Sequence, residues 1–299
     1  MAERPQAILI AGPTASGKSA LALRLAEAEG GAIINADSQQ IYREWRILTA
    51  RPSAAETARA PHHLYGHQPI AATYSVGHWL REVTEVLQAC QARGTLPIIV
   101  GGTGLYFKAL TEGIAPIPTT PPDIRTRGEA KLAALGLATF AAEFTARDPE
   151  TAAKTDLANP MRVLRAWEVL ETTGRGLAAW QAETPPPLLD LAACRTFAVV
   201  PDRAQLYANC RTRFDAMLAS GAVDEARTVM AADPPRSAPG LKALGAPELF
   251  AHIRGDLTLD EAADAAKQAT CRYAKRQLTW VRNQMAGWQR IAPGTSPEG

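Results

Sequence analysis

A glycine-rich loop near the start of the chain has the residue types and the spacing of a phosphate-binding site. It fits the pattern G-x-x-x-x-G-K-[ST] and consists of Gly12, Pro13, Thr14, Ala15, Ser16, Gly17, Lys18 and Ser19. An apolar run at 7–10 precedes it as an expected strand, and apolar residues at helical spacing follow it. Backbone N–H groups and the positive end of a helix dipole then point at phosphate oxygens. We therefore predict that the loop binds a diphosphate-like group.

Two side chains of this loop would add chemistry of their own. Lys18 adds a fixed positive charge. The hydroxyl of Ser19 can ligate a Mg²⁺ ion that bridges two phosphates. We therefore expect Mg²⁺ as a cofactor, with Ser19 as its metal ligand.

A carboxylate stands where a second strand is expected to end. The apolar run at 31–36 leads to Asp37, whereas the expected strand at 96–100 ends in Gly101-Gly102-Thr103-Gly104, which has no carboxylate. Asp37 is thus the strand-end acid positioned to face the loop. Two roles stay open at this point. Asp37 holds the metal, as in a kinase, or it acts as a base toward an acceptor.

Further motifs follow the loop in order along the chain. They are Asp37-Ser38-x-Gln40-Ile41-Tyr42-Arg43, Pro61-His62-His63-Leu64, Gly101-Gly102-Thr103-Gly104-Leu105-Tyr106, Asn159-Pro160-x-Arg162-Val163-Leu164-Arg165-Ala166-x-Glu168-Val169, Thr173-Gly174-Arg175 and Thr270-x-Arg272-Tyr273-Ala274-Lys275-Arg276-Gln277-Leu278-Thr279-Trp280. Together with the loop, this ordered set resembles the tRNA dimethylallyltransferases, also called tRNA isopentenyltransferases. The resemblance covers nearly the whole chain. A phosphate-binding loop alone would be unspecific, but the ordered set is highly specific.

The resemblance implies a reaction and roles within it. A dimethylallyl group would pass from dimethylallyl diphosphate to the exocyclic N6 of an adenosine beside the anticodon of a tRNA. The catalytic residues would be Asp37, Lys18 and Thr103. Lys18 would stabilise the leaving diphosphate, Asp37 would accept the proton of N6, and Thr103 would supply a hydroxyl donor at the mouth of the loop. The target base would be flipped out of its stack to react.

The resemblance also implies which residues contact the tRNA anticodon stem-loop. One group lies beside the expected catalytic centre: Asp37, Ser38, Gln39, Gln40 and Thr103. The others are Arg125, Met161, Arg162, Val163, Leu164, Arg165 and Lys242. Arg162 and Arg165 are three apart on an expected helix, with Arg175 beyond, and such a patch can track a phosphodiester backbone. We expect His62, His63, Tyr273 and Trp280 to be structural, and Arg272, Lys275 and Arg276 to form a solvated helix face.

The segment 44–52 lacks the Gly-x-Asp-Ile-Gly that usually precedes its Thr-Ala-basic-Pro ending, and three single positions also depart from the family's usual pattern. Met161 stands where a Gln is common, Asn209 replaces an Arg, and Ala246 replaces a Tyr. None of the three lies in the loop or at Asp37. The departures therefore bear on tRNA affinity rather than on the class of reaction.

The order of strands and helices predicts an α/β fold, with a P-loop-type parallel sheet flanked by helices. Proline clusters at 116–122 and 185–187 read as stiff connectors around an alanine-rich stretch of helical periodicity. We therefore expect a core domain over 1–117 and 188–299 and an inserted all-helical, tRNA-binding subdomain over 118–187. Further strands or helices are expected at 195–200, 76–92, 204–220, 223–230 and 260–285, and an irregular stretch at 45–73.

Composition sets broader limits. The chain has 299 residues, of which 46% are hydrophobic, and a formal net charge of +2. Such a chain can bury a large core, and a nucleic-acid site on it must be a local basic patch. Its cysteines are scattered, without a C-x-x-C pair, so a metal cluster or a disulfide framework is not expected. We see no signal peptide or membrane-spanning run, and we expect a cytoplasmic monomer that does not contact membranes.

Other functions use the same loop. A small-molecule kinase or NTPase would consume ATP, although the missing second strand-end acid counts against it. A non-catalytic RNA-binding regulator would bind tRNA without forming a product. A transferase acting on free AMP or ATP would not need the inserted subdomain.

Overall fold

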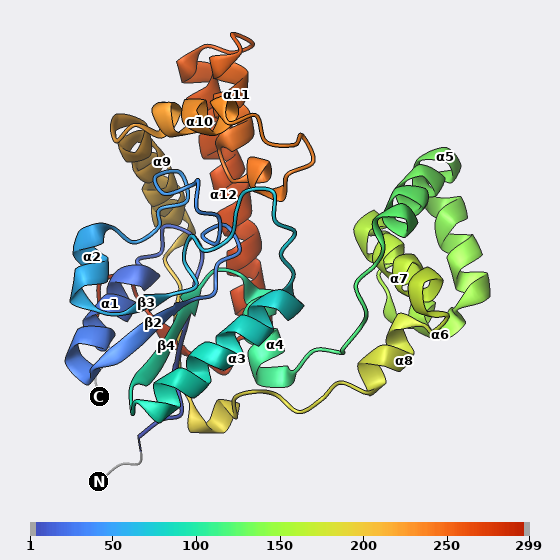
Figure 1. Ribbon diagram of the computed structural model, residues 1–299, viewed down its shortest axis with the longest axis horizontal. Helices are drawn as coiled ribbons and strands as arrows, with labels where there is room; N and C mark the ends of the chain where they lie inside the picture. Colours follow the sequence, from blue (N-terminus) through green and yellow to red (C-terminus); the bar gives the residue numbers. More distant parts are fainter. Residues whose placement is uncertain (1–3, 296–299) are drawn as a thin grey trace. The chain divides into compact units, whose positions relative to one another are not determined.

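The computed structural model describes residues 4–295, and within them the chain forms one parallel sheet of six strands (Figure 1). In spatial order the strands are β3 (His62–His63), β2 (Gly31–Asn35), β4 (Leu96–Gly101), β1 (Ile8–Ala11), β5 (Arg195–Val199) and β6 (Gln289–Ile291). The α/β class and the four longer strands confirm the prediction. The two short outer strands, β3 and β6, were not predicted.

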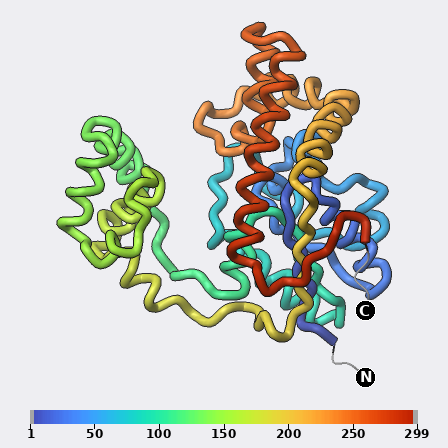
Figure 2. The backbone as a smooth tube through the Cα atoms, turned by 180° about the vertical axis from the view of Figure 1, so that it is seen from behind, coloured from blue at the N-terminus to red at the C-terminus, as the bar shows by residue number. Residues whose placement is uncertain are grey.

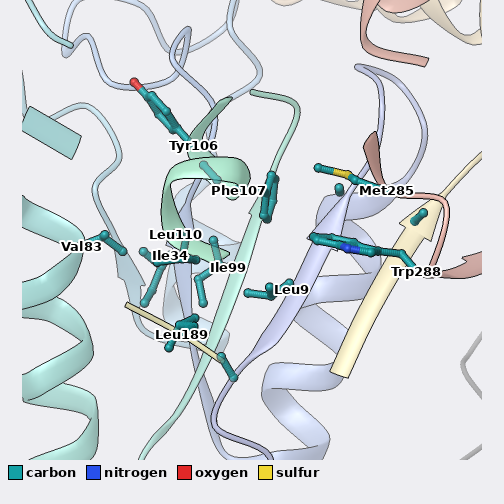
Figure 3. Packing of buried hydrophobic residues seen from close by; sticks show 14 of the residues in the cluster. Leu9, Ile34, Val83, Ile99, Tyr106, Phe107, Leu110, Leu189, Met285 and Trp288 are labelled. Carbon is teal, nitrogen blue, oxygen red and sulfur yellow. The ribbon is translucent and has the colours of Figure 1, made fainter. Parts of the chain in front are cut away.

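Alternate residues of β1 pack on opposite faces of the sheet. Ile8 and Ile10 lie in a cluster with helix α1 (Lys18–Glu29) on one face. Leu9 lies in a cluster with α3 (Val76–Ala92), α4 (Gly104–Glu112) and the end of α12 (Leu259–Gln284). Figure 3 shows Leu9, Ile34 and Ile99, from three neighbouring strands, together in that second cluster. Burial on both faces explains why the strands read as continuous apolar runs.

The later helices of the core extend beyond the sheet. Helices α9 (Arg203–Ala219) and α12 lie side by side, with α10 (Ala222–Ala231) and α11 (Ala246–Ile253) packed at their far end (Figures 1 and 2). Their apolar cluster takes in the turns at 41–48, which follow Asp37. The 3-10 turn η2 (Pro239–Lys242) packs against α11, whereas the other 3-10 turn, η1 (Leu191–Ala193), lies just before β5. The core helices predicted at 76–92, 204–220, 223–230 and 260–285 are all present.

Side-chain caps set several of these helix starts. Ser75 and His78 form a capping box that begins α3 at Val76. A second box, between Ser53 and Glu56, begins a short helix, α2 (Ala54–Arg59), inside the stretch that was expected to be irregular. The rest of that stretch consists mainly of turns. None of the helices among the described residues is both long and apolar enough to cross a bilayer.

A second compact unit comprises Glu112–Pro187. Its helices are α5 (Pro122–Arg147), α6 (Pro149–Lys154), α7 (Pro160–Thr173) and α8 (Leu177–Ala182), and these residues, all described, form no strand. Phe140, Phe144 and Trp167 are the large side chains of its own core. The sequence placed this inserted unit at 118–187, so the structure begins it a few residues earlier and ends it at the same proline.

Candidate functional site

The glycine-rich loop joins β1 to α1 and brings its polar groups into a confined space. Gly17 has a left-handed φ of 87°, which starts the helix at Lys18. A Cβ on Gly12 would lie 2.9 Å from the carbonyl oxygen of Val199, so the loop can approach β5 only with glycine there. Lys18 is buried, and its Nζ donates to the carbonyl of Pro13 at 3.3 Å. These internal contacts fix the shape of the loop.

Burial makes the charge of Lys18 sensitive to its surroundings. It lowers the pKa of Lys18 from 10.5 to about 8. The negative charge of Asp37 opposes this shift, and the positive charge of Arg213 adds to it. The three side chains are thus electrostatic neighbours, with two cations and one anion. An anionic ligand on the loop would restore the proton affinity of Lys18.

Arg213 belongs to this site, although it was not singled out from the sequence. It comes from α9, and its guanidinium donates to the hydroxyl of Thr14 in the loop. Burial lowers its pKa, as for Lys18. One helical turn earlier, Asn209 stands where the family usually has an Arg and donates to the carbonyl of Ala15 at 3.2 Å. A basic residue at this helical spacing was a signal that could have identified Arg213.

Asp37 lies just beyond the end of β2 and is held by Asn35. The side chain of Asn35 accepts from the Asp37 N–H at 2.8 Å and donates to the Asp37 carbonyl at 3.0 Å. The carboxylate of Asp37 is buried, and one of its oxygens accepts the N–H of Gln39 at 2.9 Å. The prediction that Asp37 faces the loop agrees with its electrostatic effect on Lys18.

Thr103 reaches the same place from the neighbouring strand, β4. Its N–H donates to the carbonyl of Ala36 at 3.1 Å, and its hydroxyl oxygen accepts the N–H of Ser38 at 2.9 Å. The hydroxyl proton points to the hydroxyl of Ser38, at 3.3 Å. The structure therefore brings Thr103 and Ser38 together beside Asp37.

The two glutamines that follow are engaged inside the protein. Gln40 donates from its side-chain nitrogen to the carbonyls of Thr49 and Ala50, at 2.9 and 2.7 Å. Both N–H groups of its amide are thereby used, so Gln40 has only its oxygen left for a base edge. Gln39 accepts the N–H of Leu244 at 3.2 Å. This bond ties the turn after Asp37 to the segment just beyond Lys242, which is exposed on η2.

Two of the residues expected to contact tRNA are in the core of the helical unit. Val163 and Leu164 are 0% and 2% exposed and pack around Trp167. Their side chains therefore belong to the core of this unit, and a contact of either residue with RNA would have to come from its backbone. They lie on the apolar face of α7, whereas their neighbours Arg162 and Arg165 lie on its exposed face.

The four arginines of that unit named in the sequence analysis differ in their exposure and in their ion pairs. Arg162 is 3.6 Å from Asp156, and Arg165 donates to the hydroxyl of Thr120 at 2.6 Å; both stay largely exposed, as does Met161. Arg125 is exposed and pairs with Glu129 one turn along α5. In contrast, Arg175 is paired with Glu183 at 2.6 Å and stacks on Trp180. Arg175 is therefore part of the scaffold more than of a free patch.

The residues expected to be structural mostly are so. His62 donates from Nδ1 to the carbonyl of Ala60 at 2.8 Å and packs on Tyr65. Trp280 packs against the sheet's core cluster. Tyr273 differs, because burial and then the charge of Asp37 raise its pKa, which places its hydroxyl in the electrostatic environment of the site. Arg272, Lys275 and Arg276 are exposed on α12, as expected of a solvated face.

The oxygen atoms of Ser19 and Asp37 suit a hard cation that is bound by few protein atoms and keeps waters or phosphates as its other ligands. Ser19 is exposed at the first turn of α1. The carboxylate of Asp37 is close enough to act on the charge of Lys18, the residue before Ser19. Among residues 4–295, no group of three or more His, Cys, Asp or Glu side chains could enclose a metal. Mg²⁺ is usually bound by one or two protein oxygens together with substrate phosphates and waters. The residues present fit that mode.

Family models match most of the chain. The model described as IPP transferase matches residues 40–284, and the model described as Isopentenyl transferase matches residues 5–65. The second match contains the glycine-rich loop and Asp37, and the first contains Thr103, the helical unit and Arg213.

Individual relatives agree with the family models. A tRNA dimethylallyltransferase of Cereibacter sphaeroides is 57% identical over 97% of this chain and 89% of its own length. One of Dinoroseobacter shibae is 55% identical over 97% and 96%. The crystal structure of a tRNA isopentenylpyrophosphate transferase of Bacillus halodurans is 31% identical, with a TM-score of 0.68 over 97% of this chain and 90% of that one. By these matches and by the geometry of its site, the chain belongs to the IPP transferase family.

Proposed function

We propose that this chain transfers a dimethylallyl group from dimethylallyl diphosphate to N6 of the adenosine next to the anticodon of a tRNA, with release of diphosphate. One observation carries the proposal. The buried Lys18 of the glycine-rich loop and the partly buried Arg213 of α9 lie beside each other, and the carboxylate of Asp37 acts on the charge of both. The two cations can stabilise a leaving anion, and the carboxylate can accept a proton. The names of the relatives point to the same reaction.

The leaving group is the first requirement. As the bond between the allyl carbon and oxygen breaks, its electron pair goes to the diphosphate, and negative charge grows there. Lys18, Arg213 and the N–H groups of the loop face that charge from fixed positions. Preorganised electrostatic stabilisation of this kind is usually the largest catalytic contribution. A Mg²⁺ ion held by Ser19 and the phosphates would neutralise part of the same charge.

The nucleophile is the second requirement. The lone pair of an adenine N6 is delocalised, so N6 is a weak nucleophile until its bond to carbon begins to form. Its N–H then becomes strongly acidic, and an ordinary carboxylate suffices to accept the proton. Asp37 is held in place by Asn35 at its backbone and by the Gln39 N–H at one oxygen, so the carboxylate is positioned before the base arrives.

The helical unit supplies a surface for RNA. Arg162 and Arg165 are exposed on α7 with Met161, and Arg125 is exposed on α5. Arginines spaced along a helix can pair with successive phosphates, which position the RNA without reading its sequence. We assign these arginines to the tRNA backbone. We also propose that the enzyme is cytoplasmic and monomeric, as expected from the sequence.

Mass spectrometry of the product tests this proposal. Undermodified tRNA is incubated with the protein, dimethylallyl diphosphate and Mg²⁺, and the nucleosides are analysed. We expect one added C5H8 on an adenosine, and we expect Asp37→Asn to form this product far more slowly. A control with Gln268→Leu, at an exposed position of α12, should retain full product.

The same assay separates the alternatives. Omitting Mg²⁺ should suppress the product if Ser19 helps to hold the ion. Release of phosphate from ATP without a prenylated nucleoside would instead favour the kinase or NTPase. Binding of tRNA with neither product would favour a non-catalytic RNA-binding protein. Prenylation of free AMP in preference to tRNA would leave the helical unit without its proposed role.

A further inference from the structure

One buried glutamine of α12 bonds to both loops that form the site. The side-chain oxygen of Gln277 accepts the N–H of Thr14 at 2.8 Å, and its nitrogen donates to the carbonyl of Gly102 at 2.9 Å. Thr14 belongs to the glycine-rich loop after β1, and Gly102 to the turn after β4, the neighbouring strand. Gln277 is 6% exposed. Its two polar atoms thus link the two loops.

The turn after β4 is shaped to admit this side chain. A Cβ on Gly102 would lie 2.1 Å from the side-chain nitrogen of Gln277, a distance at which one of them must shift. One helical turn further along α12, Trp280 has the same relation to Gly104, where a Cβ would lie 2.0 Å from the indole nitrogen. The spacing of three residues puts Gln277 and Trp280 on one face of α12. The two glycines therefore permit a close approach of α12 to the turn.

The two loops that Gln277 links have different roles in the proposed reaction: one holds the diphosphate, and the other lies beside the proton acceptor. Thr14 lies in the loop that would hold the diphosphate, and its hydroxyl accepts from Arg213. Thr103 directly follows Gly102 and bonds to Ser38, next to Asp37. A rigid link between Thr14 and Gly102 therefore sets the separation between the leaving group and the proton acceptor.

We propose that Gln277 is a positioning residue, which fixes the diphosphate-binding loop relative to the turn that carries Thr103 and so aligns the allyl carbon with the attacking N6. This inference rests on the proposed function. Alignment of this kind matters because reacting atoms must be held at about 3–3.5 Å, and a displacement of about 1 Å can lower the rate ~10²-fold. Gln277 itself does not touch the reacting atoms in this account.

Misalignment has a measurable chemical consequence. In the transfer reaction the bond between the allyl carbon and oxygen breaks, the carbon bonds to N6, and the N6 proton goes to Asp37. If N6 is displaced, water can take its place at the carbon. The products are then dimethylallyl alcohol, diphosphate and a proton. The fraction of alcohol among the products therefore reports the alignment directly.

The variant Gln277→Glu tests the proposal. A glutamate can still accept the Thr14 N–H, but it cannot donate to the Gly102 carbonyl and its charge opposes that oxygen. We expect kcat to fall by ~10-fold to ~10²-fold, the KM for dimethylallyl diphosphate to change by less than about threefold, and the alcohol fraction to rise. Gln268→Leu on the same helix is the matched control and should change none of these quantities.

A second variant keeps the test decisive if Gln277→Glu folds poorly. Gly102→Ala displaces the glutamine from the opposite side and should raise the alcohol fraction in the same way. In the double variant Gln277→Ala with Gly102→Ala, the added methyl has room, so its effect should be much smaller than in the wild-type background. Loss of activity in Gln277→Glu and Gly102→Ala with an unchanged alcohol fraction would overturn the positioning role, as would unchanged kcat.

The two proposals fail differently. If wild-type protein forms neither prenylated tRNA nor alcohol, the proposed function is wrong. If wild-type protein forms prenylated tRNA and the Gln277 variants match it in kcat and in alcohol fraction, the function stands and the positioning role is wrong.

Discussion

Replacing Lys18 by methionine should stabilise the protein in the absence of ligand. At pH 7 the lysine is charged in both the folded and the unfolded chain, and the folded chain holds that charge in a buried place. The pKa falls from 10.5 to about 8 on folding. Each pH unit corresponds to 1.36 kcal/mol, so the buried charge costs roughly 3 kcal/mol at pH 7, as an upper estimate. Lys18→Met removes this cost at similar side-chain length.

The pH dependence has a definite sign. Above pH 8 the folded protein loses the proton of Lys18 while the unfolded chain keeps it up to about 10.5. The unfolded state then binds more protons, so the stability of wild-type protein rises with pH over this window relative to Lys18→Met. The advantage of the variant should therefore be largest below pH 8 and should vanish near pH 10.5.

Urea unfolding at pH 7 and pH 10 measures this difference. Trp167 and Trp180 lie in the helical unit, so replacing both by Phe leaves tryptophan fluorescence as a probe of the core alone. Lys275→Met, at an exposed position of α12, is the control and should change stability by less than about 0.5 kcal/mol at either pH. An advantage of Lys18→Met that is absent at pH 7, or that grows toward pH 10, would refute the reasoning.

Three further predictions concern ligands. Asp37→Asn should lower kcat by ~10²–10⁴-fold, while the variant still binds diphosphate. Because Asp37 raises the pKa of Lys18, the affinity of this variant for diphosphate, followed by calorimetry, should begin to fall at a lower pH than that of the wild type. Arg213→Met should raise the Kd of diphosphate by ~10-fold to ~10²-fold at low salt, as measured by titration, since a charge-assisted contact is lost; an unchanged Kd would remove Arg213 from the site. Arg162→Ala and Arg165→Ala should each raise the KM for tRNA and flatten the slope of log K against log salt by about one unit or less; unchanged slopes would direct the search to Arg276 and its neighbours on α12.

Short sequence motifs were sufficient to predict the parts of the site that lie close together along the chain. The glycine-rich loop and Asp37 could be predicted because each is a short motif next to an apolar strand. The contacts of Arg213 and Gln277 with Thr14 could not be predicted, because they join residues that are 199 and 263 positions apart in the chain. Only the packing of α9 and α12 brings them to the loop, and no short motif reports that packing.

Features that the sequence did not predict have identifiable causes. Strands β3 and β6 are two and three residues long, and exposed or polar residues in them hide any apolar pattern. Val163 and Leu164 were assigned to tRNA through the motif that contains Arg162. The burial of these side chains could be predicted from the helical spacing of Val163, Trp167 and Leu170, which marks the buried face of α7.

The order of strands has a consequence for the newly made chain. Strand β5 lies between β1 and β6, yet it follows the entire helical unit in the sequence. During synthesis at ~5–20 residues per second, β1 therefore waits for several seconds with one edge unpaired while the helical unit emerges. An unpaired edge of a parallel sheet invites pairing with other chains. The helices of Glu112–Pro187 have their own core and can form during this interval, so the ribosome-bound intermediate carries a folded insertion on an unfinished sheet.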